Sequence, residues 1–150
     1  MLKHRMLNHR QLWTLLIGVA LAAALAACSL PAGGLTGGGP ALAGSEWTLV
    51  SLKGKPPLAG TTITLKFEAD TAGGSSGCNS YGGPYTARGG RLTITDVAST
   101  MMACLEQDLM EQEALYLETL SQAAGYRATD DQLEIQDAAG ETILVFSRKG

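Results

Sequence analysis

The chain has 150 residues, with 14 acidic against 11 basic side chains and a formal net charge of −3. Three of the basic residues and both histidines lie within the first ten positions. The acidic remainder has no run of Lys or Arg, which excludes nucleic-acid binding through a basic surface.

The N-terminal residues 1–27 are predicted to be a secretory signal peptide. The basic start is followed by the apolar stretch Leu12–Ala27, which has 16 residues and ends on small side chains. A membrane-spanning helix needs about 20 apolar residues, so the stretch is short for an uncleaved anchor. Leu25–Cys28 looks like the lipobox at which bacterial signal peptidase II cuts.

Cys28 is therefore the predicted lipidation site. In proteins of this type the cysteine receives a diacylglycerol and becomes the mature N-terminus, and two or more acyl chains hold a protein at a membrane. We expect a cell-envelope protein, anchored through this lipid, and facing the periplasm from the outer membrane if the host has two membranes. Without residues 1–27 the chain keeps 8 basic and 14 acidic side chains, a formal charge of −6.

Residues 28–45 are predicted to be a lipidated N-terminus and a Gly-rich linker. Ser29–Ser45 contains six glycines, two prolines and no charge in 17 positions. A coil of this length spans roughly 20–25 Å; the alternative is that part of it packs as an N-terminal arm. The 105 residues 46–150 suit one small domain.

This domain is predicted to consist mostly of strands. Glu46–Leu52 has a β-rich composition, and Thr61–Ala69 alternates like a half-buried strand with Ile63, Leu65 and Phe67 on one face. The Ala72–Gly74 cluster indicates a turn. Shorter strands are expected at Tyr85–Ala87, Arg91–Thr95, Gln132–Gln136 and Thr142–Ser147.

One segment has helical periodicity instead. Apolar residues from Leu109 to Ala124 keep helical spacing, Asp108 followed by Glu111 resembles a capping box, and Gly125 is expected to end the run. We therefore predict an α+β domain. It would have a small, curved, mostly antiparallel sheet, or a partly open barrel, with the helix Asp108–Ala124 packed across it.

The sequence gives little support for catalysis. The predicted mature chain has no histidine, which excludes Ser-His-Asp and Cys-His catalysis and imidazole metal sites. Carboxylate pairs such as Asp130 with Asp131, or Glu111 with Glu113, are interpreted as solvated turn and helix surface. We predict no enzymatic activity, no cofactor and no metal; a hydrolase without histidine is the enzymatic alternative.

Cys78 and Cys104 are the two cysteines of the predicted exported domain. An oxidising compartment and an even count predict a disulfide. Closing this loop would stabilise the domain by roughly 3–4 kcal/mol in the chain-entropy model. Two buried free thiols and a shared metal site are the alternatives.

The segments around these cysteines carry a family resemblance. Gly77–Gly83 reads GCNSYGG and Thr100–Cys104 reads TMMAC. With Trp47–Leu49 near the start and Leu144–Phe146 near the end, they resemble the META domain (HslJ-like) family over nearly all of residues 46–148. The resemblance implies the same α+β fold and an association with heat-shock response, antibiotic tolerance and virulence.

Five residues in these segments are candidate binding residues: Asn79, Tyr81, Thr100, Met101 and Met102. Their main interpretation is structural. In that case Asn79 takes a left-handed turn or hydrogen-bonds its own backbone, the glycines supply unusual backbone angles, and the methionines fill gaps in the core. The alternative is that these residues form a surface patch or groove for a partner.

We therefore expect a non-enzymatic, monomeric envelope lipoprotein that acts in stress or antibiotic tolerance, with an envelope protein or a lipid as ligand. The alternative function is a carrier or chaperone that binds acyl chains or lipoprotein partners in a groove between sheet and helix. Leu65, Phe67, Met102 and Leu117 would line that groove.

Overall fold

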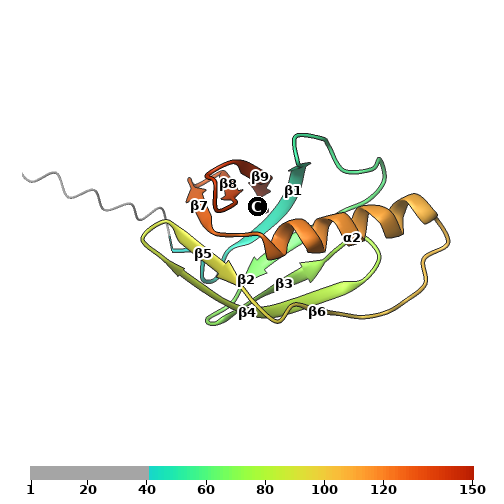
Figure 1. The fold of residues 1–150 in the computed structure, drawn as a ribbon, viewed down its shortest axis with the longest axis horizontal. Coiled ribbons are helices and arrows are strands. Elements are labelled where there is room, and N and C mark those ends of the chain that lie inside the picture. Colours follow the sequence, from blue (N-terminus) through green and yellow to red (C-terminus); the bar gives the residue numbers. More distant parts are fainter. Residues whose placement is uncertain (1–40) are drawn as a thin grey trace, which may run out of the picture. The chain divides into compact units, whose positions relative to one another are not determined.

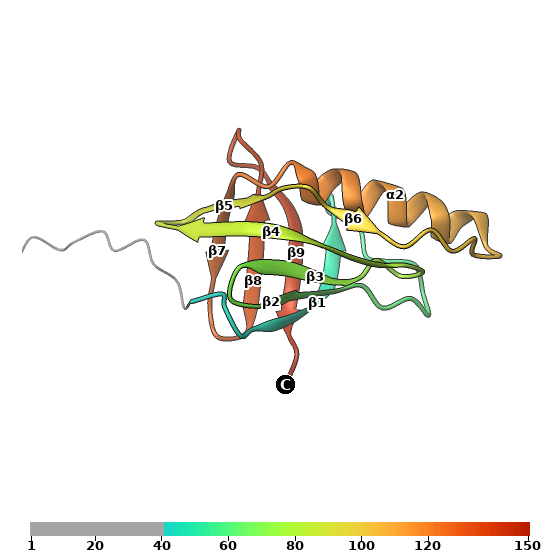
Figure 2. The same ribbon diagram turned by 90° about the horizontal axis from the view of Figure 1, so that it is seen from below.

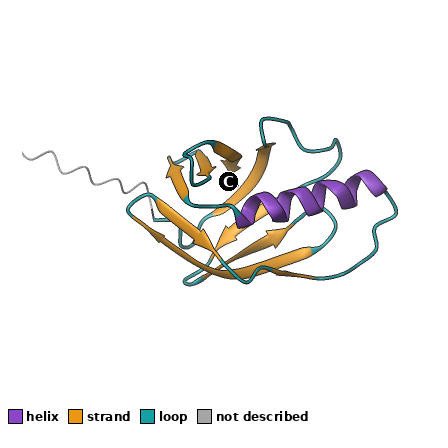
Figure 3. Cartoon of the chain, in the orientation of Figure 1, coloured by secondary structure: helices purple, strands orange, loops and turns teal. Residues whose placement is uncertain are grey.

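The computed structural model describes residues 41–150, which form nine strands and one helix (Figures 1 and 3). The predicted signal peptide, the lipidation site Cys28 and most of the predicted linker lie outside these residues. The elements are β1 Glu46–Leu52, β2 Thr64–Phe67, β3 Thr71–Ser75, β4 Ser80–Arg88, β5 Arg91–Ile94, β6 Ala98–Ser99, α2 Gln107–Ser121, β7 Gly125–Ala128, β8 Gln132–Gln136 and β9 Thr142–Arg148.

Eight of the strands form a closed antiparallel barrel, and the ninth, β6, pairs with β4 alone. The order around the barrel is β1-β2-β3-β4-β5-β7-β8-β9, and β9 pairs back onto β1. The predicted α+β class and curved antiparallel sheet are confirmed. The partly open form was not quite right, because β3 and β4 pair along five residues and close the ring.

The sequence did not indicate the β3–β4 pairing that closes the barrel, because β3 contains two glycines. Gly73 and Gly74 suggested a turn, yet both lie in β3, where Gly73 stands opposite Gly82 of β4. A Cβ on Gly73 would come within 2.5 Å of the Tyr81 carbonyl oxygen. Glycine is therefore needed here for the close approach of two strands, and the short strand predicted at Tyr85–Ala87 is the end of a longer one.

The barrel interior and the inner face of α2 make one core. The alternating residues Ile63, Leu65 and Phe67 are buried, as predicted. From the helix, Tyr116 and Leu120 are fully buried over the strands. Figures 1 and 2 show α2 lying across one end of the barrel, so the helix covers the core there.

The helix bounds differ from the prediction at both ends. α2 begins at Gln107, with Glu106 at the N-cap position and without a side-chain cap hydrogen bond. Asp108 lies inside the first turn, so the predicted capping box is wrong. The helix ends at Ser121, and Gly125 is the first residue of β7, a strand that the sequence did not indicate.

The last residues of the predicted linker belong to the folded part. Leu42 and Ser45 are buried, and the Gly44 amide donates to the Phe67 carbonyl oxygen at 2.7 Å. The Ser45 hydroxyl accepts a hydrogen bond from the Trp47 indole at 2.6 Å. The chain therefore enters the barrel as a short packed arm before β1.

Within residues 41–150 the only helix, α2, lacks the length and apolar character that a membrane-crossing helix requires.

Candidate functional site

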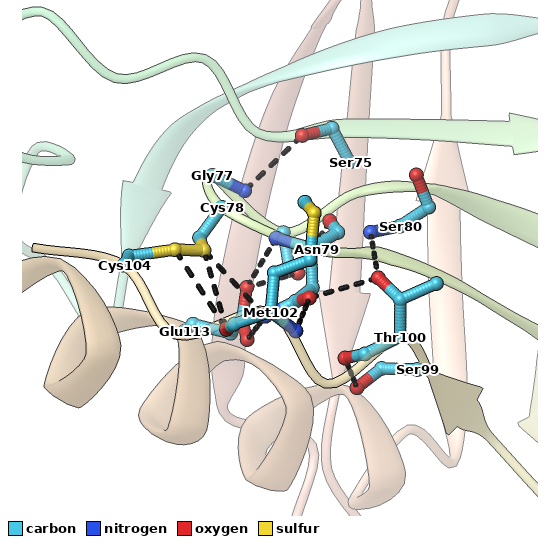
Figure 4. Close-up of a disulfide and its surroundings, with 11 residues drawn as sticks. Ser75, Gly77, Cys78, Asn79, Ser80, Ser99, Thr100, Met102, Cys104 and Glu113 are labelled. Carbon is cyan, nitrogen blue, oxygen red and sulfur yellow. Dashed lines mark hydrogen bonds between the residues drawn. A yellow bond between two sulfur atoms is a disulfide. The ribbon is translucent and has the colours of Figure 1, made fainter.

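The site is the junction between the β3–β4 turn, the segment before α2, and α2 itself (Figure 4). The predicted disulfide between Cys78 and Cys104 is present and joins Cα atoms 6.3 Å apart. Gly77, just before Cys78, has φ +111°, a backbone conformation that other residues rarely adopt. The disulfide therefore ties the residues that precede the helix to a tight turn of the barrel.

Asn79 is the centre of the junction. Its side-chain nitrogen Nδ2 donates to Glu113 Oε1 at 2.6 Å and to the Met102 carbonyl oxygen at 3.3 Å. Its Oδ1 accepts from Thr100 Oγ1 and from the Met102 amide, both at 2.8 Å. The side-chain amide thus makes all four hydrogen bonds available to it.

This arrangement corrects the structural interpretation of Asn79. Among the described residues, the non-glycine positions with positive φ are Lys53 and Asp96, so Asn79 is not in a left-handed turn. Its role is to connect three segments through its side chain. Thr100 strengthens the connection, since its hydroxyl also accepts a hydrogen bond from the Ser80 amide at 3.2 Å.

Glu113 lies on the inner face of α2 and is only 5% exposed. Its Oε2 accepts hydrogen bonds from Ser76 Oγ at 2.6 Å and from the backbone N–H of Asn79 at 2.8 Å. The prediction that this carboxylate belongs to the solvated helix surface is wrong. Burial disfavours its charged form, but the hydrogen bonds from Ser76 and Asn79 outweigh burial and lower the pKa of Glu113.

The sequence contained a signal for Glu113. Leu109, Glu113, Tyr116 and Leu120 follow one another at helical spacing, so a carboxylate occupies a position of the buried stripe. A charged residue at such a position needs hydrogen-bonding partners. The partner Ser76, which precedes the cysteine motif, gave no comparable signal.

Tyr81 and Tyr116 meet beneath the junction. Their hydroxyl oxygens are 2.5 Å apart, their rings pack edge to face, and the Tyr81 hydroxyl also donates to the Thr64 carbonyl oxygen at 2.9 Å. Burial raises the pKa of both phenols above the ordinary value. Tyr81 therefore connects barrel and helix as a neutral, buried group.

Met101 and Met102 have a different position. Met101 is 98% exposed and Met102 is 58% exposed, so the interpretation that they fill core gaps is wrong. Both side chains border a shallow cavity of about 330 Å³ beside Asn79 and Met110. Of the five predicted motif residues, three hold the junction together and two face solvent next to it.

The groove predicted between sheet and helix is not assembled from the expected residues. Leu65 and Phe67 are fully buried in the core, and Leu117 is partly buried against it. Met102 lies on the outer surface, so the four side chains do not share one lining.

The chemistry available to the junction is limited. The two sulfur atoms are joined, and in the part of the chain that the structure covers, no buried side-chain nitrogen or oxygen lacks a hydrogen-bond partner. Across residues 41–150 there is also no group of three His, Cys, Asp or Glu side chains placed to hold a metal ion. The disulfide and the hydrogen bonds of Asn79 fix the segment before α2 against the β3–β4 turn.

Comparison with known proteins identifies the domain. Residues 40–150 match the family model described as the META domain. A protein from Burkholderia xenovorans, solved by NMR, is 29% identical with a TM-score of 0.58, covering 72% of this chain and 83% of its own. A second NMR structure is 27% identical with a TM-score of 0.57, covering 71% of this chain and 90% of its own. No curated protein sequence matches the chain.

Proposed function

The chain belongs to the META domain family, and on that premise we propose that it is a non-enzymatic envelope lipoprotein whose META domain binds a partner in stress or antibiotic tolerance. The observation that carries the proposal is the division of the motif residues. The side chains of Asn79 and Thr100 make hydrogen bonds within the domain. Met101 and Met102 of the same motif face solvent instead. Such an arrangement supports binding by a surface that the junction holds in place.

The anchoring part of the proposal rests on Cys28 and the lipobox before it. Cys28→Ser should leave the preprotein uncleaved and without radiolabelled palmitate, while Ser29→Ala should be processed and labelled normally. Normal palmitate incorporation in Cys28→Ser would overturn the lipoprotein assignment.

The physiological part is tested in the host cell. Deleting the gene should reduce survival under heat or antibiotic challenge, and the wild-type chain should restore survival. Restoration by Cys28→Ser would show that the lipid anchor is dispensable. Unchanged survival of the deletion strain under every envelope stress would reject the tolerance role.

A carrier of acyl chains is the second candidate, and one observation favours it. A cavity of about 450 Å³ lies between the N-terminal arm and the ends of β4 and β7, with Leu42, Tyr85 and Tyr126 on its walls and Arg88 among its lining residues. Ligand pockets commonly have volumes of about 300–1,000 Å³. Native mass spectrometry of the chain from membrane extracts should then find a bound lipid of defined mass; a protein partner in its place would favour the interaction module.

A further inference from the structure

Four exposed apolar side chains lie within ten residues of one another, on the segment before α2 and on its first turn, and we call them the apolar tip: Met101, Met102, Leu105 and Met110. Leu105 is 99% exposed, and Met110 on the helix is 37% exposed. The three methionines border the same cavity, beside the polar residues of the junction. Exposed apolar clusters mark interaction sites, and flexible, polarisable methionine suits surfaces that adapt to a partner.

The backbone under the tip is held in place before any partner arrives. The amide and the carbonyl of Met102 are both hydrogen-bonded to the Asn79 side chain, and Cys104 is tied to Cys78. A surface of this kind loses little conformational freedom on binding, which favours affinity. The exposed side chains are therefore presented by a fixed support.

The rim of the tip is acidic. Between Arg91 and Arg127 the sequence has no Lys or Arg but six carboxylates. Glu106, Asp108 and Glu111 are exposed residues at the start of α2, close in the chain to Leu105 and Met110, and none of them takes part in an ion pair within the described residues. A partner that covers the tip would gain from positive charge around an apolar centre.

The segment that carries most of the tip lies far from the point where the described chain enters the domain. In Figures 1 and 2 the segment between β6 and α2 lies at one end of the molecule, and the first described residues lie near β5 and β7 at the other. A partner could therefore reach the tip without passing the N-terminal arm. The acidic rim also disfavours contact with anionic head groups.

We propose that the apolar tip docks a cationic amphipathic helix of another polypeptide. Its apolar side would lie on Met101, Met102, Leu105 and Met110, and its Lys or Arg side chains would face Glu106, Asp108 and Glu111. The amphipathic helix is the binding mode in which apolar anchors recur along one face and charges flank them. The inference rests on the proposed function in so far as both treat the domain as an interaction module.

The test uses the full chain in phosphatidylcholine nanodiscs and a fluorescent synthetic peptide with leucine along one helical face and lysine along the other. Fluorescence anisotropy should show binding above that of empty nanodiscs, weakening as salt is added. A peptide with glutamate in place of lysine should not bind. Equal binding of both peptides would overturn the proposal.

Two variants locate the site. Met101→Ser/Leu105→Ser changes side chains that are almost fully exposed, and binding should weaken roughly tenfold or more, whereas Val50→Ser on β1 should not weaken it.

The acidic residues are tested separately. Glu106→Gln/Asp108→Asn/Glu111→Gln should weaken binding roughly three- to tenfold and flatten the salt dependence; Asp130→Asn/Asp131→Asn/Glu141→Gln is the matched control. Thermal unfolding verifies that each variant is folded.

The outcomes separate this inference from the proposed function. Unchanged peptide affinity in the folded Met101→Ser/Leu105→Ser variant would overturn the docking site. If that variant also restored stress survival in a deletion strain, the proposed function would stand without this surface. Binding to empty nanodiscs alone would make the peptide a lipid ligand and would likewise overturn the proposal.

Discussion

Asn79 and Glu113 are polar side chains buried at the junction, whereas Met101 and Leu105, close by on the segment that the junction holds, are apolar and almost fully exposed. A stable domain normally favours the opposite placement. The buried pair keeps its polar groups because each is hydrogen-bonded. The exposed pair has no such stabilising contacts, so the two regions should respond very differently to mutation.

The largest effect is expected for Asn79→Asp. The change places a second carboxylate beside Glu113 and removes the side-chain nitrogen of Asn79, which donates to Glu113 Oε1 and to the Met102 carbonyl. Breaking a buried charged network in this way should lower the free energy of unfolding by about 3–5 kcal/mol. Urea unfolding measures this loss, with the exposed Gln132→Glu as the matched amide-to-acid control; a loss below about 1 kcal/mol would contradict the central role of Asn79.

Breaking the disulfide should have a slightly smaller effect. Cys78→Ala/Cys104→Ala frees a loop with a sequence separation of 26, and the chain-entropy model gives a loss of about 3–4 kcal/mol. In the wild type, an alkylating agent should label neither cysteine of the denatured domain until a reductant is added. Two adducts without reduction would show that the thiols are free.

Glu113→Gln tests the charge at the junction. It keeps the shape of the side chain but loses the charge-assisted hydrogen bonds, which should cost about 1–3 kcal/mol near neutral pH. The folded wild type holds the pKa of Glu113 below its ordinary value of 4.5. Its contribution is therefore complete above that value and is lost as the pH falls through the lower, folded-state pKa.

The measurement is the free energy of unfolding against pH for wild type and Glu113→Gln. The two curves should converge as the pH falls below about 4.5, because protonation removes the same charge from the wild type. The exposed Glu118→Gln on the same helix is the control. Parallel curves down to acid pH would show that the difference in stability between the two proteins does not come from the charge of Glu113.

The smallest effect is expected at the apolar tip. Met101→Ser should change the free energy of unfolding by less than about 0.5 kcal/mol, because the side chain contacts almost nothing within the domain. A loss above about 1 kcal/mol in urea unfolding would show that Met101 is part of the fold, and would remove the contrast between the two regions.

Much of the fold was visible in the sequence, because local pattern and burial agree there. Ile63, Leu65 and Phe67 alternate in the chain and all point into the barrel. Glu46–Leu52 and Gln132–Gln136 are strands with the predicted bounds. Strand β3 was missed because its two glycines have no side chains to form a pattern, and its pairing with β4 is decided by a close backbone approach.

The candidate site shows what only the tertiary structure decided. The sequence determined that Cys78, Asn79, Thr100 and Met102 belong to informative motifs, since their order and spacing can be read directly. It did not determine which side chains are buried, because Asn79 and Glu113 obtain their hydrogen bonds from segments more than twenty residues away. Burial of those two, and exposure of the methionines beside them, follow from how the barrel brings the turn and the helix together.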